Sequence, residues 1–190
     1  MRITNDTEHD SGDDLDVERV LSFVNTLDPV GDDELDTVDQ LDAWLRERAL
    51  VAGDDRPTAA DLRLARSLRA GLLAELLAHH GEPPDRPALV ALDEIAADLP
   101  LTVSFTGGSR ALTRPALRPA GSGVRGGLGA ILASVMALQT EDRWSRLKAC
   151  PDATCLQAFY DASRNRSRRW CSMESCGNRA KVRGYRARQG

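Results

Sequence analysis

The chain has 190 residues, of which 42% are hydrophobic and 28% are charged. This length allows one good core plus a small appended module, so we expect two folded units. The longest apolar stretch, near Ala70 to Ala78, is interrupted by Glu75 and falls short of the roughly 20 residues of a membrane-spanning helix. We therefore expect a soluble, cytoplasmic protein without membrane contact.

The formal net charge of -4 hides an uneven distribution along the chain. Residues 1–60 hold 17 acidic and 5 basic side chains, whereas residues 143–190 hold 3 acidic and 12 basic ones. A basic end on an otherwise acidic chain often marks nucleic-acid binding, and arginines on a solvated face are the alternative. The charge alone does not decide between these two interpretations.

The first 142 residues are predicted to form an acidic arm and a helical domain. Residues 1–14 lack apolar periodicity and are predicted to be disordered, and residues 15–142 are predicted to form one α-rich domain. Apolar residues at helical spacing predict its helices. These helices are expected from Asp16 to Asp28, from Leu35 to Leu45, from Thr58 to His80, from Leu89 to Leu99 and from Leu128 to Glu141.

A β-hairpin is predicted between the fourth and fifth helices. Leu101–Phe105 alternates apolar and polar residues, and Gly107-Gly108 provides a turn before a second strand near Leu112. The glycine-rich segment 119–127 is predicted to be flexible. Gly126-Gly127-x-Gly129 is interpreted as linker and helix entry, because it lacks the Lys-Ser/Thr of a Walker phosphate loop. The predicted fold class is therefore mainly α, of the α+β type.

Two polar pairs in the helical domain have alternative interpretations. Adjacent residues on a helix point about 100° apart, so we interpret His79 and His80 as the polar end of a helix and not as a metal or acid-base site. Asn25 and Thr26 can line a small-molecule pocket. We favour a structural hydrogen bond that caps the helix end.

Four cysteines, Cys150, Cys155, Cys171 and Cys176, form a C-x4-C-x15-C-x4-C array near the end of the chain. Two turns that each offer two thiolates favour one tetrahedral zinc site. The alternative, a pair of disulfides, needs an oxidising compartment, and the N-terminus has no apolar signal segment. Four protein thiolates leave no open position for water or substrate, so we expect one structural zinc ion that does not catalyse. We expect no enzyme, because the sequence shows no nucleophile-base pair.

Residues 143–190 are predicted to form a small treble-clef-like zinc finger that ends in a basic helix. Phe159, Tyr160 and Trp170 are expected to pack around the metal. Arginines between the cysteine pairs suit phosphate contacts, and Asn and Arg side chains after the last cysteine suit base edges. The nucleic-acid-binding candidates are Arg164, Arg166, Arg168, Arg169, Asn178, Arg179, Lys181, Arg183, Arg186 and Arg188. An RNA-binding or protein-contact finger is the alternative.

Several segments resemble known families. Arg146–Cys150, Phe159–Asp161, Ser163–Asn165, Ser167–Cys171 and Cys176–Arg179 look like the CGNR zinc finger. Phe23–Leu27, Leu41–Leu45 and Arg63–Leu73 are similar to the ABATE domain that precedes this finger. The resemblance implies a bacterial, stress-related transcription regulator that binds DNA through the finger. It also implies an N-terminal domain that acts as a sensor, for which a small-molecule effector is expected. Oligomerisation is the other role that we consider for this domain, because one small finger contacts few bases and a homodimer would raise specificity.

Overall fold

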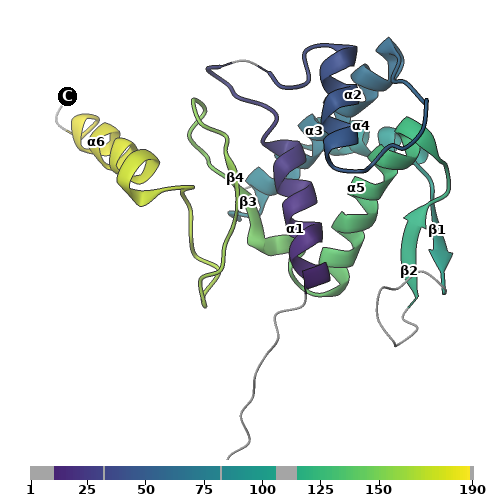
Figure 1. Ribbon diagram of the computed structural model, residues 1–190. Helices are drawn as coiled ribbons and strands as arrows, with labels where there is room; N and C mark the ends of the chain where they lie inside the picture. Colours follow the sequence, from purple (N-terminus) through teal and green to yellow (C-terminus); the bar gives the residue numbers. More distant parts are fainter. Residues whose placement is uncertain (1–10, 32, 82, 106–114, 189–190) are drawn as a thin grey trace, which may run out of the picture.

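A computed structural model describes residues 11–31, 33–81, 83–105 and 115–188, and for residues 11–14 it describes the backbone. Its helices are α1 (Ser11–Val24), α2 (Val38–Glu47), α3 (Ala59–Ala78), α4 (Arg86–Ala97), α5 (Gly123–Thr140) and α6 (Asn178–Arg186). Strands β1 (Leu101–Ser104) and β2 (Ala116–Pro119) form one hairpin, and β3 (Leu147–Ala149) and β4 (Ala158–Tyr160) form another. Short helical turns η1 (Trp144–Arg146) and η2 (Met173–Gly177) precede β3 and α6. This architecture, shown in Figure 1, confirms the predicted mainly α fold class.

The helix starts follow local capping chemistry. Thr58 accepts a hydrogen bond from the backbone of Asp61, whose carboxylate accepts one from the backbone of Thr58, so α3 begins at Ala59 as its capping box predicts. A second capping box, between Thr37 and Gln40, starts α2 at Val38, three residues after the predicted start. Helix α1 begins at Ser11 and not at Asp16, and the first ten residues of the predicted acidic arm lie outside the described residues.

The second strand of the first hairpin lies later in the chain than predicted. Leu101 pairs with Pro119 and Ser104 pairs with Ala116, whereas the predicted turn and Leu112 lie outside the described residues. Strand β2 packs on α5 at Gly129, where an added Cβ would lie 3.3 Å from Pro119 Cβ. This close contact between strand and helix explains why the strand extends to the proline.

Helix α5 begins at Gly123, so the prediction of a flexible linker over 119–127 is wrong in its second half. Gly126 and Gly127 lie inside the helix and are buried. A Cβ added at Gly126 would lie 2.7 Å from the carbonyl oxygen of Gly121, and one added at Gly127 would lie 2.8 Å from that of Leu50. These glycines therefore permit close packing and do not supply flexibility.

One hydrophobic core extends from the helices into the second hairpin. Phe23 of α1, Leu41 of α2, Leu72 of α3 and Ile131 of α5 are almost fully buried. Leu147 of β3 is buried in the same cluster. The base of the cysteine-containing module thus shares its core with the helical domain. None of the helices in the described part of the chain combines the length and the apolar character that crossing a bilayer requires.

An ion pair between the buried Arg69 and the partly exposed Asp33 holds the segment before α2 against α3. Both terminal nitrogens of Arg69, which is 5% exposed, donate to the carboxylate of Asp33 at 2.6 Å. Arg69 Nη1 also donates to Thr26 Oγ1 at 3.0 Å. These hydrogen bonds lower the pKa of Asp33, although burial opposes the change. Asp33 thus connects the segment before α2 to α3.

We expect Asp33→Asn to destabilise the protein near neutral pH because the mutation leaves the Arg69 charge buried without its partner. A lowered carboxyl pKa stabilises the fold above its ordinary value of about 4 and loses this contribution as the pH falls below it. The difference in unfolding free energy between the parent and the variant should therefore shrink below about pH 4. Urea titrations at several pH values measure this difference, and a difference that grows in acid would contradict it.

Candidate metal centre and nucleic-acid interface

The four predicted cysteine ligands meet at one point, where the turn between β3 and β4 approaches the segment before α6. Their Sγ atoms all lie within 4.8 Å of one another. Cys155 Sγ lies 3.5 Å from Cys171 Sγ, which lies 3.6 Å from Cys176 Sγ. Four thiolates at about 2.3 Å from a tetrahedral zinc ion lie about 3.8 Å apart. All four are free thiols, so the cluster fits one zinc ion and not a pair of disulfides.

The first two cysteines flank a tight turn between β3 and β4. The Cys150 N–H donates to the Gln157 carbonyl at 2.9 Å, and the Cys155 N–H donates to the Asp152 carbonyl at 2.8 Å. The carboxylate of Asp152 accepts hydrogen bonds from both the N–H and the hydroxyl of Thr154. Local backbone and side-chain bonds therefore aim both thiols at one point.

Cys171 lies before the turn η2, and Cys176 lies near the end of that turn, directly before α6. The Gly177 N–H donates to the Ser172 carbonyl at 3.0 Å and closes η2. An added Cβ at Gly177 would lie 2.7 Å from Met173 Sδ and 3.3 Å from Trp170. A glycine after Cys176 thus lets the last ligand approach the cluster at the start of the helix.

The thiol environment favours a cation in the cluster. Cys150 and Cys176 are almost fully buried. Burial opposes ionisation of Cys176, but hydrogen bonds, the largest of them from Arg179, lower the pKa of this thiol to about 7. Burial and the adjacent thiols raise the pKa of Cys171. Four packed thiols cannot all ionise without a compensating charge, which a zinc ion supplies.

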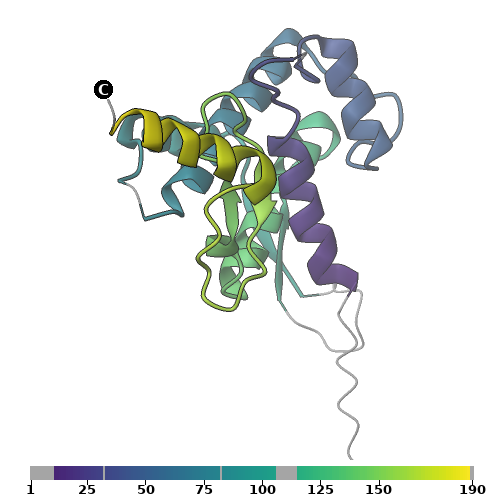
Figure 2. The ribbon, with the colours of Figure 1, turned by 90° about the vertical axis from the view of Figure 1, so that its left-hand side faces the viewer.

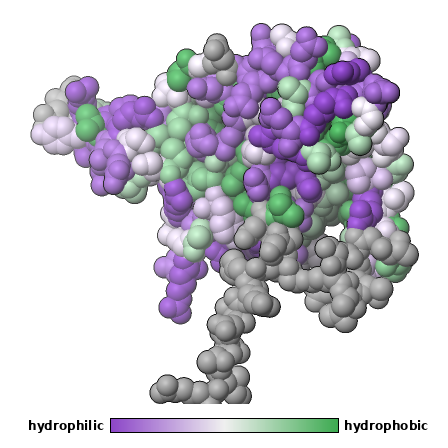
Figure 3. Space-filling model, in the orientation of Figure 1, coloured by the Kyte–Doolittle hydropathy of each residue, from purple (hydrophilic) through white to green (hydrophobic). Residues whose placement is uncertain are grey.

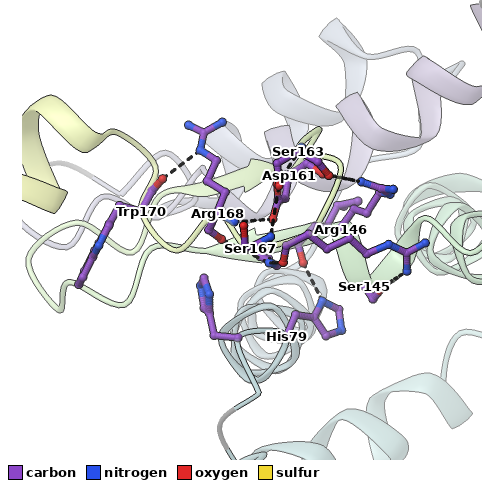
Figure 4. A network of polar contacts seen from close by, with 12 residues as sticks. His79, Ser145, Arg146, Asp161, Ser163, Ser167, Arg168 and Trp170 are labelled. Carbon is purple, nitrogen blue, oxygen red and sulfur yellow. Dashed lines mark hydrogen bonds and ion pairs between the residues drawn. The ribbon is translucent and has the colours of Figure 1, made fainter.

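The strand that leads to Cys150 is held by a buried ion pair. Figure 4 shows its carboxylate, Asp161, beside Ser163 and Arg168. Lys148 is 3% exposed and Asp161 is fully buried, and Lys148 Nζ donates to Asp161 Oδ2 at 2.8 Å. Asp161 also accepts hydrogen bonds from the Ser163 hydroxyl and the Arg168 N–H. Burial would raise the pKa of Asp161, but these bonds lower it to about 2. The pair ties the arginine-rich loop to β3.

The two histidines at the end of α3 bind the same strand. His79 Nδ1 donates to the Leu147 carbonyl at 2.6 Å, and His80 Nε2 donates to the Ala149 carbonyl at 2.7 Å. Burial lowers the pKa of His80, which favours its neutral form. Their position at the polar end of a helix agrees with the sequence. Their contacts with β3, the strand that leads to Cys150, could not be predicted from the sequence.

Asn25 holds the partner strand. Its side-chain Nδ2 donates to the Ala158 carbonyl at 3.1 Å, and its Oδ1 accepts from the Ala158 N–H at 2.7 Å. The amide thus pairs with β4 as a neighbouring strand would. Asn25 makes a structural hydrogen bond, as the sequence favours, but to the finger and not to its own helix end.

The predicted ligand pocket has a counterpart in the structure. A cavity of about 320 Å³ lies between the helical domain and the finger. Asn25, Thr26 and Glu34 line one side, and Cys155 and Arg179 line the other. Thr26 is 1% exposed and donates its hydroxyl hydrogen to the Phe23 carbonyl. Both predicted residues therefore lie at a cavity while serving structural hydrogen bonds.

We expect Asn25→Ala to loosen the finger from the helical domain. The variant leaves both backbone groups of Ala158 without their side-chain partner, which costs about 1–3 kcal/mol of unfolding free energy. Hydrogen-deuterium exchange should rise at β4 with unchanged zinc content. Gln157→Ala, which alters an exposed neighbour, is the matched control. Equal effects of the two variants would contradict this prediction.

The arginine-rich loop is more ordered than its composition indicates. Arg166 forms an ion pair with Asp142, and Arg168 donates to the Trp170 and Cys171 carbonyls. The guanidinium of Arg168 also lies 4.6 Å above the ring of Phe159, and that of Arg169 lies 5.9 Å from the ring of Trp170. The aromatic residues thus pack with cations in this module.

Helix α6 projects from the finger, on the opposite side of the molecule from the first hairpin (Figures 1 and 2). Asn178 Nδ2 donates to the Glu174 carbonyl at 3.1 Å, so this candidate base-reading side chain supports the turn before the helix. Arg179 and Arg183 each contact the carboxylate of Asp152. Two of the predicted DNA contacts on α6 are thus also intramolecular contacts.

The remaining candidates are exposed cations, one in the loop between the cysteine pairs and three on α6 or directly after it. The surface over α6, at the left of Figure 3, is largely hydrophilic. Four exposed candidates make no ion pair or side-chain hydrogen bond with the described residues of the chain. These cations are Arg164, Lys181, Arg186 and Arg188. Their charges are available to a partner.

Two family models match the chain. Residues 146–189 match the CGNR zinc finger, and residues 18–142 match ABATE, whose description is putative stress-induced transcription regulator. The chain belongs to the ABATE family. No curated protein matches it. In this ABATE protein the CGNR finger and the sulfur cluster together form a site for one zinc ion.

The zinc ion would be held by Cys150, Cys155, Cys171 and Cys176 and would link the two turns. Four thiolates complete a structural zinc site, so the ion supplies folding energy at this position. Residues of both units hold the remaining parts of the finger in place. Asn25 and the two histidines bind the hairpin of β3 and β4 to the ABATE domain, and Asp161 orders the loop between the cysteine pairs.

Proposed function

We propose that this ABATE protein is a zinc-dependent, DNA-binding transcription regulator of the cytoplasm and has no enzymatic activity. The finger supplies the DNA contacts, and the ABATE domain supports and regulates it. The observation that carries the proposal is the cationic helix α6, which stands directly on the zinc-binding turns with exposed, unpaired cations. A phosphate backbone is the partner that such a surface suits.

The arginines and the lysine of the finger differ in how free they are to bind DNA. Arg164, Lys181, Arg186 and Arg188 have no ion pair to break before they meet a phosphate, so they should contribute most to affinity. Arg166, Arg168 and Arg169 are held by the finger and are more suited to shaping the loop than to leaving it. Arg179 lies at the start of the helix and Arg183 lies one turn further along, and both contact Asp152 in the first zinc-binding turn.

Fluorescence anisotropy with a short labelled duplex of random sequence tests the proposal. Affinity should fall steeply with salt because bound cations release counterions from the DNA. Arg186→Ala should weaken binding and lower the slope of log affinity against log salt by about one. Arg63→Ala removes an exposed arginine from α3 and is the matched control. Absent or salt-insensitive binding would overturn the proposal.

The same assay separates the alternatives. Equal competition by single-stranded or duplex RNA would favour an RNA-binding finger. Absent binding to both nucleic acids, with an intact zinc site, would favour a protein-contact finger. Binding-site selection on random DNA would then show whether the protein prefers a sequence.

The cavity between the two domains supports the regulatory part of the proposal. It joins Asn25 of the ABATE domain to Cys155 and Arg179 of the finger, so an effector bound there would contact both units. Such an effector should raise the thermal stability and change the DNA affinity together. A homodimer would place two fingers on one duplex and raise specificity. Light scattering on the zinc-loaded protein with and without DNA measures this state.

A further inference from the structure

Asp152 occupies an unusual position for an acidic residue in a basic finger. It lies in the turn between Cys150 and Cys155 and is 3% exposed. Its Oδ1 accepts hydrogen bonds from the Thr154 N–H at 3.2 Å and from the Thr154 hydroxyl at 2.9 Å. These bonds orient the carboxylate and leave Oδ2 for another partner.

The partners of Asp152 Oδ2 are two arginines of α6, Arg179 and Arg183. Arg183 Nη2 donates to Asp152 Oδ2 at 3.1 Å, and Arg179 Nε lies 3.4 Å from the same oxygen. The two arginines are one helical turn apart, so both reach a single carboxylate from one face of the helix. The contact joins the first zinc-binding turn to a helix that follows the second one.

Helix α6 has few other means of fixing its direction. None of its residues from Asn178 to Arg186 is buried, so apolar packing does little to orient it. Asn178 bonds to Glu174 in the preceding turn, and Arg179 Nη2 lies 2.9 Å from Cys176 Sγ. Both contacts hold the start of the helix, whereas the Arg183 contact acts one turn further along.

We propose that Asp152 is a positioning residue for α6, which holds Arg179 and Arg183 so that the helix keeps one direction relative to the zinc-binding turns. This inference rests on the proposed DNA-binding function for its consequence. The acceptor side chain is 2% exposed, whereas those of Arg179 and Arg183 are 50% and 57% exposed. A guanidinium has five N–H donors, so each arginine can hold Asp152 and still offer donors to a phosphate.

The variant Asp152→Asn separates positioning from simple charge. Asparagine keeps an oxygen for Thr154 and removes the negative charge that holds the arginines. If Asp152 only repelled DNA, the variant would bind more tightly, because its net charge rises by one. If Asp152 positions the helix, the variant should bind at least about threefold more weakly because α6 loses its fixed direction.

Hydrogen-deuterium exchange provides a readout that does not need DNA. Residues 179–186 should exchange faster in Asp152→Asn than in the parent protein, with zinc content unchanged. Asp152→Glu should restore part of the protection because it keeps the charge. Thr154→Val removes the other side-chain bond to the carboxylate and should leave the exchange of α6 near that of the parent.

A background variant guards against a general folding defect. In protein that carries Arg179→Gln and Arg183→Gln, the further change Asp152→Asn should not speed α6 exchange. Unchanged α6 protection in the single variant Asp152→Asn, tighter DNA binding by that variant, or faster exchange in the background variant would each overturn the inference. Absent DNA binding by the parent would overturn the proposed function, and the exchange experiment would still decide the role of Asp152.

Discussion

Replacement of Cys176 by serine is expected to remove zinc from the protein and to unfold the finger from Cys150 to α6. Structural zinc contributes about 10–16 kcal/mol of apparent binding free energy in small fingers, so loss of one of four thiolates should be a large effect. Cys176 is 1% exposed and connects the metal directly to α6. The zinc content measured by metal analysis should fall below one ion per chain, and hydrogen-deuterium exchange of the backbone amides should become faster across the finger.

The consequences should reach the ABATE domain. Leu147, Ala149 and Ala158 belong to the common core, and both His79 and His80 bond to β3 carbonyls. The midpoint of thermal unfolding should therefore fall as well, while α1, α2 and α5 keep their helicity because most of their core contacts lie outside the finger.

Ser172→Ala is the matched control for this variant. Ser172 lies in the same turn, and its hydroxyl oxygen accepts one long hydrogen bond of 3.4 Å from the Ser175 N–H. It should retain zinc and the protection of α6. Full zinc content in Cys176→Ser, or the same loss in Ser172→Ala, would show that the sulfur cluster does not hold the finger together.

Local patterns predicted the parts of this structure that local chemistry fixes. The Thr58 to Asp61 spacing predicts the start of α3, because a capping box needs no distant partner. The cysteine spacing predicts the metal cluster, because each pair lies in a single turn. Both features are specified within a few residues.

The features that sequence reasoning missed depend on distant segments. The second strand begins at Ala116 because Pro119 packs against Gly129 of α5. Asp152 meets Arg183 across 31 positions, and no local pattern indicates that contact. An isolated lysine between Leu147 and Ala149, in an otherwise apolar strand, was the signal that a buried partner exists.

That partner makes Asp161→Asn the second variant with a large expected effect. The change would leave the Lys148 ammonium buried without a counter-charge, since Lys148 is 3% exposed. Breaking one side of a buried ion pair costs about 3–5 kcal/mol. Urea unfolding followed by circular dichroism should show this loss, and the loop from Ser163 to Arg168 should exchange faster.

Two further variants serve as controls for Asp161→Asn. Asp142→Asn breaks the ion pair with Arg166. The Asp142 side chain is 79% exposed, so this variant should lose less than about 1 kcal/mol of unfolding free energy. The double variant Lys148→Met with Asp161→Leu removes both charges and should be less destabilised than Asp161→Asn. If Asp161→Asn cost no more than Asp142→Asn, the pair would not order the loop. Because that loop carries Arg164, disorder there should also weaken DNA binding while the zinc site stays intact.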